Sequence, residues 1–376
     1  MNRPATSLPR LPMVGGSQRP WTDWTVAVTG MNARADNPGP GLAIARCLRR
    51  DPAFRGSIIG LGYDVLDPGL HTRDVVDAGV LLPYPSDGTE ALKERLDEVL
   101  ATHRIDALIP ALDAEMATMI ALEPWLQRRG VRLFTPTQPM LEARAKDRLP
   151  DLAAAAGIAT PACRRITNAA ALDEITEFPI VVKGCFYDAY VCRTAAEAHY
   201  AFAKLAATWG YPVLVQPFVP GVEVNMTGIG DGMGGILGQV AMRKRALTDK
   251  GKAWAGVTIR DAAFDRFAAD VMASLRWRGP FEIEALRDPD GRLHLIEINP
   301  RFPAWIYLSA EVGRNLPSAL LRLMAGEAPQ TFDPPSAGAC FVRFAEEVVL
   351  SLAELEAVTI TGATLPSAPP IRRVAA

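Results

Sequence analysis

One short stretch, Gly279–Arg301, constrains this chain most. It reads GPFEIEALRDPDGRLHLIEINPR, two runs that alternate apolar and polar residues around an Asp-Pro-Asp-Gly turn. This is the pattern of a β-hairpin. Because side chains on a strand repeat every second residue, Glu282 and Glu284 share one face, and so do Glu297 and Asn299.

The register of this hairpin decides its chemistry. If Glu284 pairs with Glu297, two carboxylates and the Asn299 carboxamide meet on one face, with Arg301 just beyond. Facing carboxylates are unfavourable unless a cation lies between them, and hard oxygen ligands open to water suit a Mg²⁺ ion that holds nucleotide phosphates. A register shifted by one pair would put Glu282 in place of Glu284. The alternative is the solvated polar face of an edge hairpin.

The composition is that of an ordinary globular protein. Of 376 residues 49% are hydrophobic and 22% charged, and the net charge is −2, which gives no electrostatic case for nucleic acid or an anionic membrane as the main partner. No apolar run reaches the roughly 18 residues of a membrane span. The cysteines lack the paired spacing of a metal site, which predicts reduced thiols and a cytoplasmic location. A chain of this length is expected to form two or three packed units.

Residues 1–21 are Pro-rich and are predicted to be a disordered leader. Over residues 22–139, strands alternate with helices, which predicts a Rossmann-like, doubly wound parallel sheet. The expected strands are the apolar runs 24–30, 57–61, 106–110 and 131–134, and the expected helices are 42–50 and 88–103.

Open sheets of this kind bind ligands at the carboxyl ends of their strands. The loop Pro38-Gly39-Pro40-Gly41 comes at such an end, before a helix, and is expected to form an anion-receptive corner, although it is not GxGxxG. Asp64 is either a ribose-binding acid or a turn residue. Asp113 and Glu115 either share the ligand crevice with this loop or are acids favoured at a helix start by the macrodipole.

The rest of the chain predicts α+β structure. Helices are expected over 140–156, 169–177, 195–209, 262–275, 303–307, 312–325 and 351–357, and strands over 178–183, 212–219, 221–226, 235–242 and 339–344. Pro217 places its strand at an edge or a hinge, because proline cannot donate to a central ladder. The segment Arg243–Gly256 is expected to be a basic loop.

Three features then follow in order: a lysine that ends a strand (Lys183), a strand with a proline hinge (Leu214–Val219), and the hairpin that ends in Glu-Ile-Asn-Pro-Arg. Their order and spacing resemble the ATP-grasp superfamily, and most closely the pattern of the carbamoyl phosphate synthase large subunit. The resemblance covers roughly Val26–Pro317. It implies that the Rossmann-like sheet precedes a two-lobed ATP-grasp domain: a small lobe with a flanking helix over 140–219, a large lobe with the Mg²⁺ site over 220–330, and a C-terminal extension over 331–376.

The resemblance also implies roles around the nucleotide. Lys146 and Lys183 would reach the phosphates, a role that suits lysine as a compact, rotatable charge. Gln216, Phe218 and Val219 would offer main-chain groups to adenine at an unpaired sheet edge. The family often has glutamate where this chain has Gln216, a change that main-chain recognition would tolerate.

Further roles concern the metal and the transferred phosphoryl group. Glu284, Glu297 and Asn299 match the Mg²⁺ ligands of the family, with Mn²⁺ as a substitute ion. Arg301 would hold the γ-phosphoryl group or an acyl phosphate with its planar fork. Glu223 matches an acid that faces the ribose or the active-site network.

In the family, a loop at the position of the basic segment closes over the phosphates and the acceptor. The resemblance therefore implies catalytic roles for Arg243 and Lys252 and nucleotide binding by Lys244; the alternative is a mobile, solvated turn. The chain departs from the family at residues 184–190, where a loop that is normally glycine-rich reads GCFYDAY. Phosphate cradling by successive glycine amides is less available there.

The implied activity is ATP-dependent ligation. A carboxylate is activated as an acyl phosphate with release of ADP, and an amine then attacks to form an amide or peptide bond. The expected partners are small-molecule or peptide carboxylates and amines, with a homodimer as the common family outcome. The alternatives are a bicarbonate-dependent reaction of the carboxylase or carbamoyl-phosphate type, and a non-catalytic nucleotide-binding protein. Because the chain holds a single ATP-grasp unit, the full synthase reaction is not expected.

Overall fold

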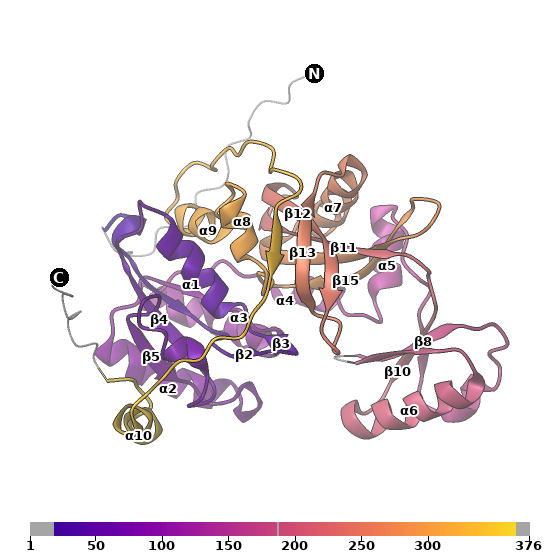
Figure 1. The fold of residues 1–376 in the computed structure, drawn as a ribbon, viewed down its shortest axis with the longest axis horizontal. Coiled ribbons are helices and arrows are strands. Elements are labelled where there is room, and N and C mark those ends of the chain that lie inside the picture. Colours follow the sequence, from indigo (N-terminus) through magenta and orange to yellow (C-terminus); the bar gives the residue numbers. More distant parts are fainter. Residues whose placement is uncertain (1–18, 186–187, 366–376) are drawn as a thin grey trace.

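Three sheets follow one another along the long axis of the molecule (Figure 1). The computed structural model describes residues 19–185 and 188–365, so most of the predicted leader lies outside the described residues. Trp21, its last residue, begins the 3-10 helix Trp21–Asp23 and is buried against the N-terminal core. Ordered structure therefore begins before residue 22.

The N-terminal sheet is parallel, with the strand order β5-β4-β1-β6. Its strands are β1 (Thr25–Val28), β4 (Ser57–Gly62), β5 (Ala78–Leu81) and β6 (Ala107–Ile109). Three of the four predicted strands are confirmed, whereas β5, a short run that begins Ala-Gly, was not predicted. The fourth prediction, 131–134, is wrong: only the bridge between Ala107 and Arg132 forms. The carbonyl of Leu133 accepts a hydrogen bond from the Arg278 side chain instead of from a strand.

Helices cover both faces of this sheet, which confirms the doubly wound prediction. Helix α1 (Gly41–Arg50) lies on one face, and α2 (Thr89–Thr102) and α3 (Asp113–Arg128) pack on the other. Gly41 lets α1 start directly behind the first strand, because a Cβ there would lie 2.1 Å from the carbonyl oxygen of Thr29. In the loop before α1, residues Ala33–Arg34 (β2) and Asn37–Pro38 (β3) form a small hairpin.

The small sheet is antiparallel, with the order β7-β10-β8-β9, and α6 (Ala195–Trp209) lies along it (Figure 1). Its strands are β7 (Arg164–Ile166), β8 (Ile180–Gly184), β9 (Ala189–Cys192) and β10 (Val213–Pro217). The edge position predicted for the proline-containing strand is wrong, since β10 lies between β7 and β8. Pro217 is tolerated because it is the last residue of β10 and lies beyond the end of β7. The helix predicted over 169–177 is reduced to the 3-10 turn Ala169–Leu172.

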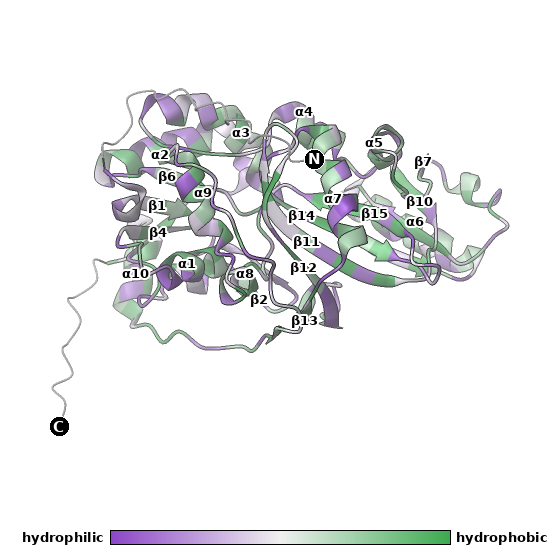
Figure 2. Cartoon of the chain, turned by 90° about the horizontal axis from the view of Figure 1, so that it is seen from above, coloured by the Kyte–Doolittle hydropathy of each residue, from purple (hydrophilic) through white to green (hydrophobic). Residues whose placement is uncertain are grey.

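The large sheet has six antiparallel strands in the order β15-β14-β11-β12-β13-β16. These are β11 (Val222–Asp231), β12 (Ile236–Leu247), β13 (Ala253–Ile259), β14 (Arg278–Arg287), β15 (Leu293–Asn299) and β16 (Cys340–Val342). Helix α7 (Ala262–Leu275) packs its apolar residues on one face. Hydrophilic and hydrophobic residues alternate along these strands (Figure 2), so the other face carries polar side chains.

Two predictions about this region are corrected. The predicted basic loop is mostly strand, because β12 and β13 pair from Ala241 to Leu247 and leave a turn over residues 248–252. The predicted helix 140–156 is two helices, α4 (Gln138–Ala143) and α5 (Leu149–Ala156). Pro150 explains the break, since its ring would clash with the carbonyl of residue 146 in a continuous helix. Helix α5 packs in the core of the large sheet, not with the small one.

The C-terminal residues join two units. Helices α8 (Tyr307–Glu311) and α9 (Leu316–Met324) pack against α1, and β16 completes the large sheet at β13. The chain then crosses to α10 (Leu352–Thr361) beside the N-terminal sheet (Figure 1), where Ala363 bridges to β5. None of the helices described is long and apolar enough to cross a bilayer.

Candidate active site

The hairpin of β14 and β15 forms in the register that places the two carboxylates together. Glu284 lies opposite Glu297, and Glu282 lies opposite Asn299, with a bulge after Glu284. The register shifted by one pair is therefore excluded. The hairpin lies at the sheet edge, with β15 outermost, but its polar face is not a solvated one, because both Glu282 and Asn299 are buried.

Glu284 is held as a carboxylate by nearby lysines. Burial would raise its pKa, but the ammonium of Lys244, whose Nζ lies 3.6 Å from Glu284, and the charge of Lys252 lower the pKa to about 2. The Nζ of Lys244 also contacts the carboxyl group of Glu223. Burial and the charge of Glu284 raise the pKa of Glu223 to about 8, so Lys244 faces one ionised and one protonated carboxyl group at neutral pH.

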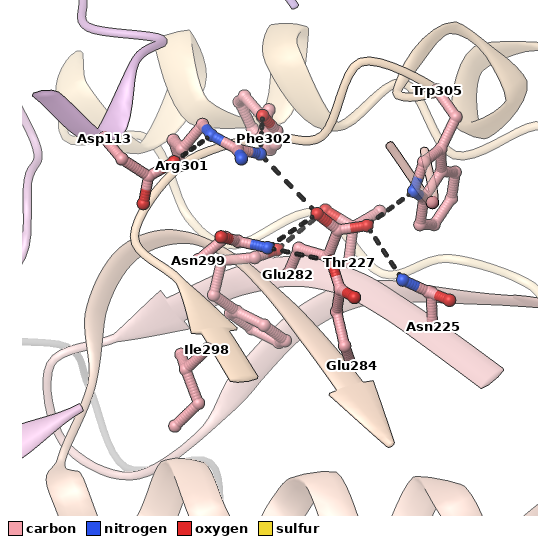
Figure 3. Close-up of polar contacts among 12 residues, drawn as sticks. Asp113, Asn225, Thr227, Glu282, Glu284, Ile298, Asn299, Arg301, Phe302 and Trp305 are labelled. Atoms are coloured by element: carbon pink, nitrogen blue, oxygen red, sulfur yellow. Dashed lines mark hydrogen bonds and ion pairs between the residues drawn. The ribbon is translucent and has the colours of Figure 1, made fainter. Parts of the chain in front are cut away.

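Asn299 is oriented by the two carboxylates beside it. Its Nδ2 donates to Glu282 and to Glu284, each at 3.1 Å, so the amide oxygen points away from them (Figure 3). A flipped amide would put that oxygen against two carboxylates. The oxygen of Asn299 is therefore the atom offered to a ligand.

Glu282 is buried and already committed to other side chains. One oxygen accepts from Trp305 Nε1 at 2.7 Å and from Asn225 Nδ2 at 3.2 Å, and the other lies 3.5 Å from Arg301 Nη1 (Figure 3). Burial and the charge of Glu284 raise its pKa. Glu282 therefore supports its neighbours and leaves Glu284 as the more available oxygen donor.

Arg301 follows directly after the hairpin and lies between two carboxylates. Its Nε donates to Asp113 Oδ2 at 2.7 Å, and its Nη1 donates to the carbonyl of Phe302 at 3.3 Å and faces Glu282. Burial would lower the pKa of Arg301, but the charges of Asp113 and Glu282 raise it. The guanidinium is thus fixed in place and fully charged.

Two lysines lie near Glu297. Lys146, in the break between α4 and α5, has its Nζ 3.3 Å from Glu297. Lys183, on β8, is 7% exposed and forms no ion pair among the described residues. Burial lowers its pKa, and the thiol of Cys163 raises it only in part. A buried ammonium without an anion is costly, so this side of the site is prepared for an anionic ligand.

The predicted hinge follows β10. Gln216 is buried, and the N–H of Phe218 donates to the carbonyl of Pro179, so that amide is not free for adenine. Because β7 pairs only with residues 213–215, the outer edge of Gln216 has no strand partner. Phe218 is partly exposed, and Val219 follows it in irregular structure. The side chain of Glu223 lies beside Lys244 and Glu284, which is one of the two positions expected for it.

A cavity of about 200 Å³ opens beside Glu284 and Arg301. Its walls come from four distant parts of the chain: the Pro38–Pro40 loop, the start of α3 at Asp113, the turn between β12 and β13 with Lys252, and the C-terminal segment with Arg343. The prediction that the loop and Asp113 share a crevice is confirmed. Lys252 forms no ion pair among the described residues, and the side chain of Arg343 donates to the carbonyl of Ala253.

Other predicted positions do not come to the cavity as expected. Arg243 is exposed and points to the opposite face of β12 from Lys244. In the loop before α1, the N–H groups of Gly39 and Gly41 donate to main-chain carbonyls and Pro40 has none, so the anion-receptive corner stays a prediction that rests on the first turn of α1. Asp64 is a turn residue that accepts from the N–H of Leu66.

Glu115 is also not a ligand residue. Its carboxylate is fully buried and accepts hydrogen bonds from Thr29, Tyr63 and the N–H groups of Ala111 and Leu112. It therefore caps the start of α3 from inside.

Three residues of the site were not assigned from the sequence. Trp305 lies four residues after the hairpin, so its position near the site could have been predicted from the sequence. Arg343 and Asn32 gave none, because only the pairing of β16 with β13 and the β2–β3 hairpin bring them to the cavity. The oxygen of Asn32 is buried and has no hydrogen-bond partner among the described residues.

Comparison with solved structures finds the same architecture in a biotin carboxylase and an L-amino acid ligase. A biotin carboxylase from Campylobacter jejuni, in complex with β-γ-ATP, is 14% identical over 82% of this chain and 73% of its own, with a TM-score of 0.63. An L-amino acid ligase from Bacillus licheniformis is 14% identical over 80% of this chain and 74% of its own, with a TM-score of 0.62. The chain has the ATP-grasp fold.

A third similar structure contains the ligands expected of such a site. It is the biotin carboxylase domain of the 2-oxoglutarate carboxylase from Hydrogenobacter thermophilus, with MgADP, ADP and bicarbonate. It is 15% identical over 81% of this chain and 70% of its own, with a TM-score of 0.59. No protein-family model and no curated protein sequence matches this chain. At these identities the likeness establishes the fold, and the activity has to be argued from the site.

Proposed function

We propose that this protein is an ATP-dependent carboxylate–amine ligase that forms an amide or peptide bond and releases ADP and phosphate. One observation carries the proposal: Glu297 lies near Lys183, a buried cation with no ion pair among the described residues, and Glu284 lines a separate cavity with Lys252 and Arg343. A site of this form can hold a polyphosphate on one side and a second anion on the other, with the hairpin between them.

Lys183 and Lys146 bind the ATP phosphates in this proposal, and Gln216, Phe218 and Val219 border the adenine. The phosphates would supply an anionic partner for Lys183, and Lys146 would pair with them in place of Glu297. The Phe218 amide is already bonded to Pro179, so adenine would be bound through the other main-chain groups of the hinge.

Mg²⁺ is the expected metal, with Mn²⁺ as a substitute, and the donor set fits it. Glu284, Glu297 and the oxygen of Asn299 are hard ligands on one face, and Mg²⁺ in nucleotide sites uses one or two carboxylates together with phosphates. No cluster of three or more histidine, cysteine, aspartate or glutamate side chains is gathered for a metal in residues 19–185 and 188–365, which agrees with a site completed by ATP. When bound, the metal neutralises charge on the phosphates.

The carboxylate substrate occupies the cavity beside Arg301. One of its oxygens attacks the γ-phosphorus of ATP, the bond to the β-phosphate oxygen breaks, and ADP leaves. The amine nitrogen then attacks the acyl carbon. The bond between that carbon and the phosphate oxygen breaks, and phosphate departs together with the amine proton. Arg301, Lys252 and Arg343 stabilise the negative charge of these groups, so positioning and electrostatics provide the catalysis without a side-chain nucleophile.

Product analysis tests this proposal. Purified protein with Mg·ATP is incubated with a panel of amino acids, other carboxylates and amines. We expect ADP and phosphate only when a suitable carboxylate and amine are both present, together with a product whose mass is their sum less one water. An Arg301→Lys variant is the matched control. Release of AMP and pyrophosphate would contradict the proposal.

A bicarbonate-dependent reaction is the second candidate, favoured by the likeness to carboxylase structures. The cavity of about 200 Å³ has room for a molecule much larger than bicarbonate, with its four non-hydrogen atoms. This size favours an organic carboxylate. ADP release that depends on bicarbonate and needs no amine would select the carboxylase reaction, and ATP binding without turnover under any condition would select a non-catalytic nucleotide-binding protein.

We also propose how the chain divides and where it acts. The small lobe centres on the sheet within 164–217, whereas α5 and β16 belong with the large lobe, so the predicted boundaries at 140 and 331 move accordingly. The five cysteines, all free, support a cytoplasmic location in which thiols stay reduced. A homodimer and a peptide substrate stay proposals that size measurement and the substrate panel address.

A further inference from the structure

Asp113 lies where the N-terminal sheet meets the hairpin. It is the first residue of α3, and its Oδ2 accepts the Nε–H of Arg301 at 2.7 Å across 188 positions of sequence. Its other oxygen lies 3.3 Å from Nη1 of Arg144, which in turn donates to the carbonyl of Ile298, between two of the proposed metal ligands. The Asp113 carboxylate thus contacts both Arg301, directly after the hairpin, and Arg144, which is hydrogen-bonded to the main chain of β15.

Asp113 is not needed as a helix cap. The free N–H groups at the start of α3 belong to Ala111 and Leu112 among others, and Glu115 accepts from both. Burial would raise the pKa of Asp113, but the charges of Arg301 and Arg144 lower it. The side chain is therefore a carboxylate that serves the arginines.

The contact also orients Arg301. Its Nε is used by Asp113 and its Nη1 by Phe302 and Glu282, whereas Nη2 has no hydrogen-bond partner among the described residues. Arg301 and Asp113 both line the cavity. Because a guanidinium is planar, fixing Nε and Nη1 leaves Nη2 as the nitrogen free to donate into the cavity.

We propose that Asp113 is a positioning residue: it holds the Arg301 guanidinium with one N–H edge toward the cavity, so that the N-terminal sheet completes the ligase site. This inference rests on the proposed function. It adds a specific task for the N-terminal sheet, which otherwise only forms one wall.

Kinetics of Asp113→Asn test the inference in the full-length protein. We expect kcat to fall about 10- to 100-fold, the effect of losing one charge-assisted hydrogen bond, with the KM for ATP unchanged. The matched control is Glu123→Gln, which weakens another ion pair between α3 and β14, that of Glu123 with Arg278 at 2.5 Å, away from the cavity. We expect its kcat to stay within about twofold of the wild type, as for substitutions away from a site.

A double-mutant cycle separates positioning from a general structural effect. If Asp113 acts through Arg301, Asp113→Asn adds no further loss of kcat to the Arg301→Lys variant. Losses that multiply, or equal losses in Asp113→Asn and Glu123→Gln, would overturn the inference.

A second readout does not depend on activity. In nucleotide-free protein labelled with ¹⁵N-arginine, the Nε–H of Arg301, assigned by its loss in Arg301→Lys, should exchange slowly with water. It should exchange fast in Asp113→Asn and slowly in Glu123→Gln. If this pattern holds but the wild type forms no ligation product, the proposed function fails and the positioning contact stands. If exchange is the same in all three proteins, the positioning inference fails whatever the activity.

Discussion

Two buried cations flank the acidic hairpin, and the protein holds them in opposite ways. Arg301 lies between Asp113 and Glu282, and these carboxylates raise its pKa. Lys183 has no ion pair among the described residues, and burial lowers its pKa. The charge of Arg301 is therefore balanced before any ligand binds, whereas the charge of Lys183 requires an anion supplied by a ligand.

This difference indicates a division of labour. A preorganised arginine costs no reorganisation when charge develops beside it, which suits a group that acts on the transferred phosphoryl. A buried lysine that forms no ion pair among the described residues is stabilised most when an anionic ligand binds. This suits a group that binds the phosphates of ATP. Four substitutions test this comparison, in order of decreasing expected effect.

Arg301→Lys should have the largest effect. The planar fork that contacts Asp113 and Glu282 is lost, and we expect kcat to fall about 100- to 1000-fold, as when one donor to a developing oxyanion is removed. Steady-state ADP release under saturating ATP measures it. An unchanged kcat would show that Arg301 does not act on the phosphoryl group.

Lys183→Met should affect ATP binding and stability in opposite directions. We expect the KM for ATP to rise about 10- to 100-fold, because a charge-assisted contact to phosphate is lost. Without nucleotide, the variant should melt at least about 2 °C higher than the wild type, since a buried unpaired charge is removed. Thermal unfolding with and without Mg·ATP measures both. A lower melting temperature would show that Lys183 has a partner in the free protein.

Arg343→Ala should change the other side of the site. Arg343 lines the cavity, and the one hydrogen bond of its side chain to the described residues goes to the carbonyl of Ala253, so we expect the KM for the carboxylate substrate to rise about tenfold. The KM for ATP should stay the same, in contrast to Lys183→Met. Titration of each substrate in turn separates the two, and an effect on ATP alone would reverse the assignment of the two sides.

Glu223→Gln should have the smallest effect. The pKa of Glu223 is about 8 in the folded protein and about 4.3 in an unfolded chain. The folded protein therefore binds more protons between these values, and the contribution to stability, full below about pH 4.3, is lost as the pH rises through about 8. Because glutamine mimics the protonated acid, we expect a change below about 1 kcal/mol at pH 5.

The variant should also lose part of the decline in stability between pH 5 and pH 9. Urea unfolding at several pH values measures the slope, and parallel curves for the two proteins would contradict the assigned protonation of Glu223.

Much of the phosphate side could be predicted from the sequence. Alternation put Glu282, Glu284, Glu297 and Asn299 on one face, since a shift by one residue would turn every side chain to the other face. It left open a shift by one pair, which the observed pairing of Glu284 with Glu297 excluded. The resemblance to the ATP-grasp superfamily assigned Lys183 and the hinge in residues 214–219, because a strand-end lysine alone would more often be a surface residue. These signals are local, so a few adjacent residues carry them. Lys146 was predicted to bind the phosphates. The break between α4 and α5 in which it lies was not predicted, although Pro150 indicates such a break.

Only the tertiary structure decided the cavity side. Arg343 reaches the site because β16 pairs with β13, and a three-residue strand has no periodicity that identifies its partner. Asp113 could equally have been a helix-start acid, and its contact with Arg301 across 188 positions decided otherwise. The sequence by itself determined the hairpin and the shared face of its carboxylates, because alternation and turn chemistry act within one segment. The tertiary structure decided which distant charges meet that hairpin, because ion pairs between units depend on how whole sheets pack.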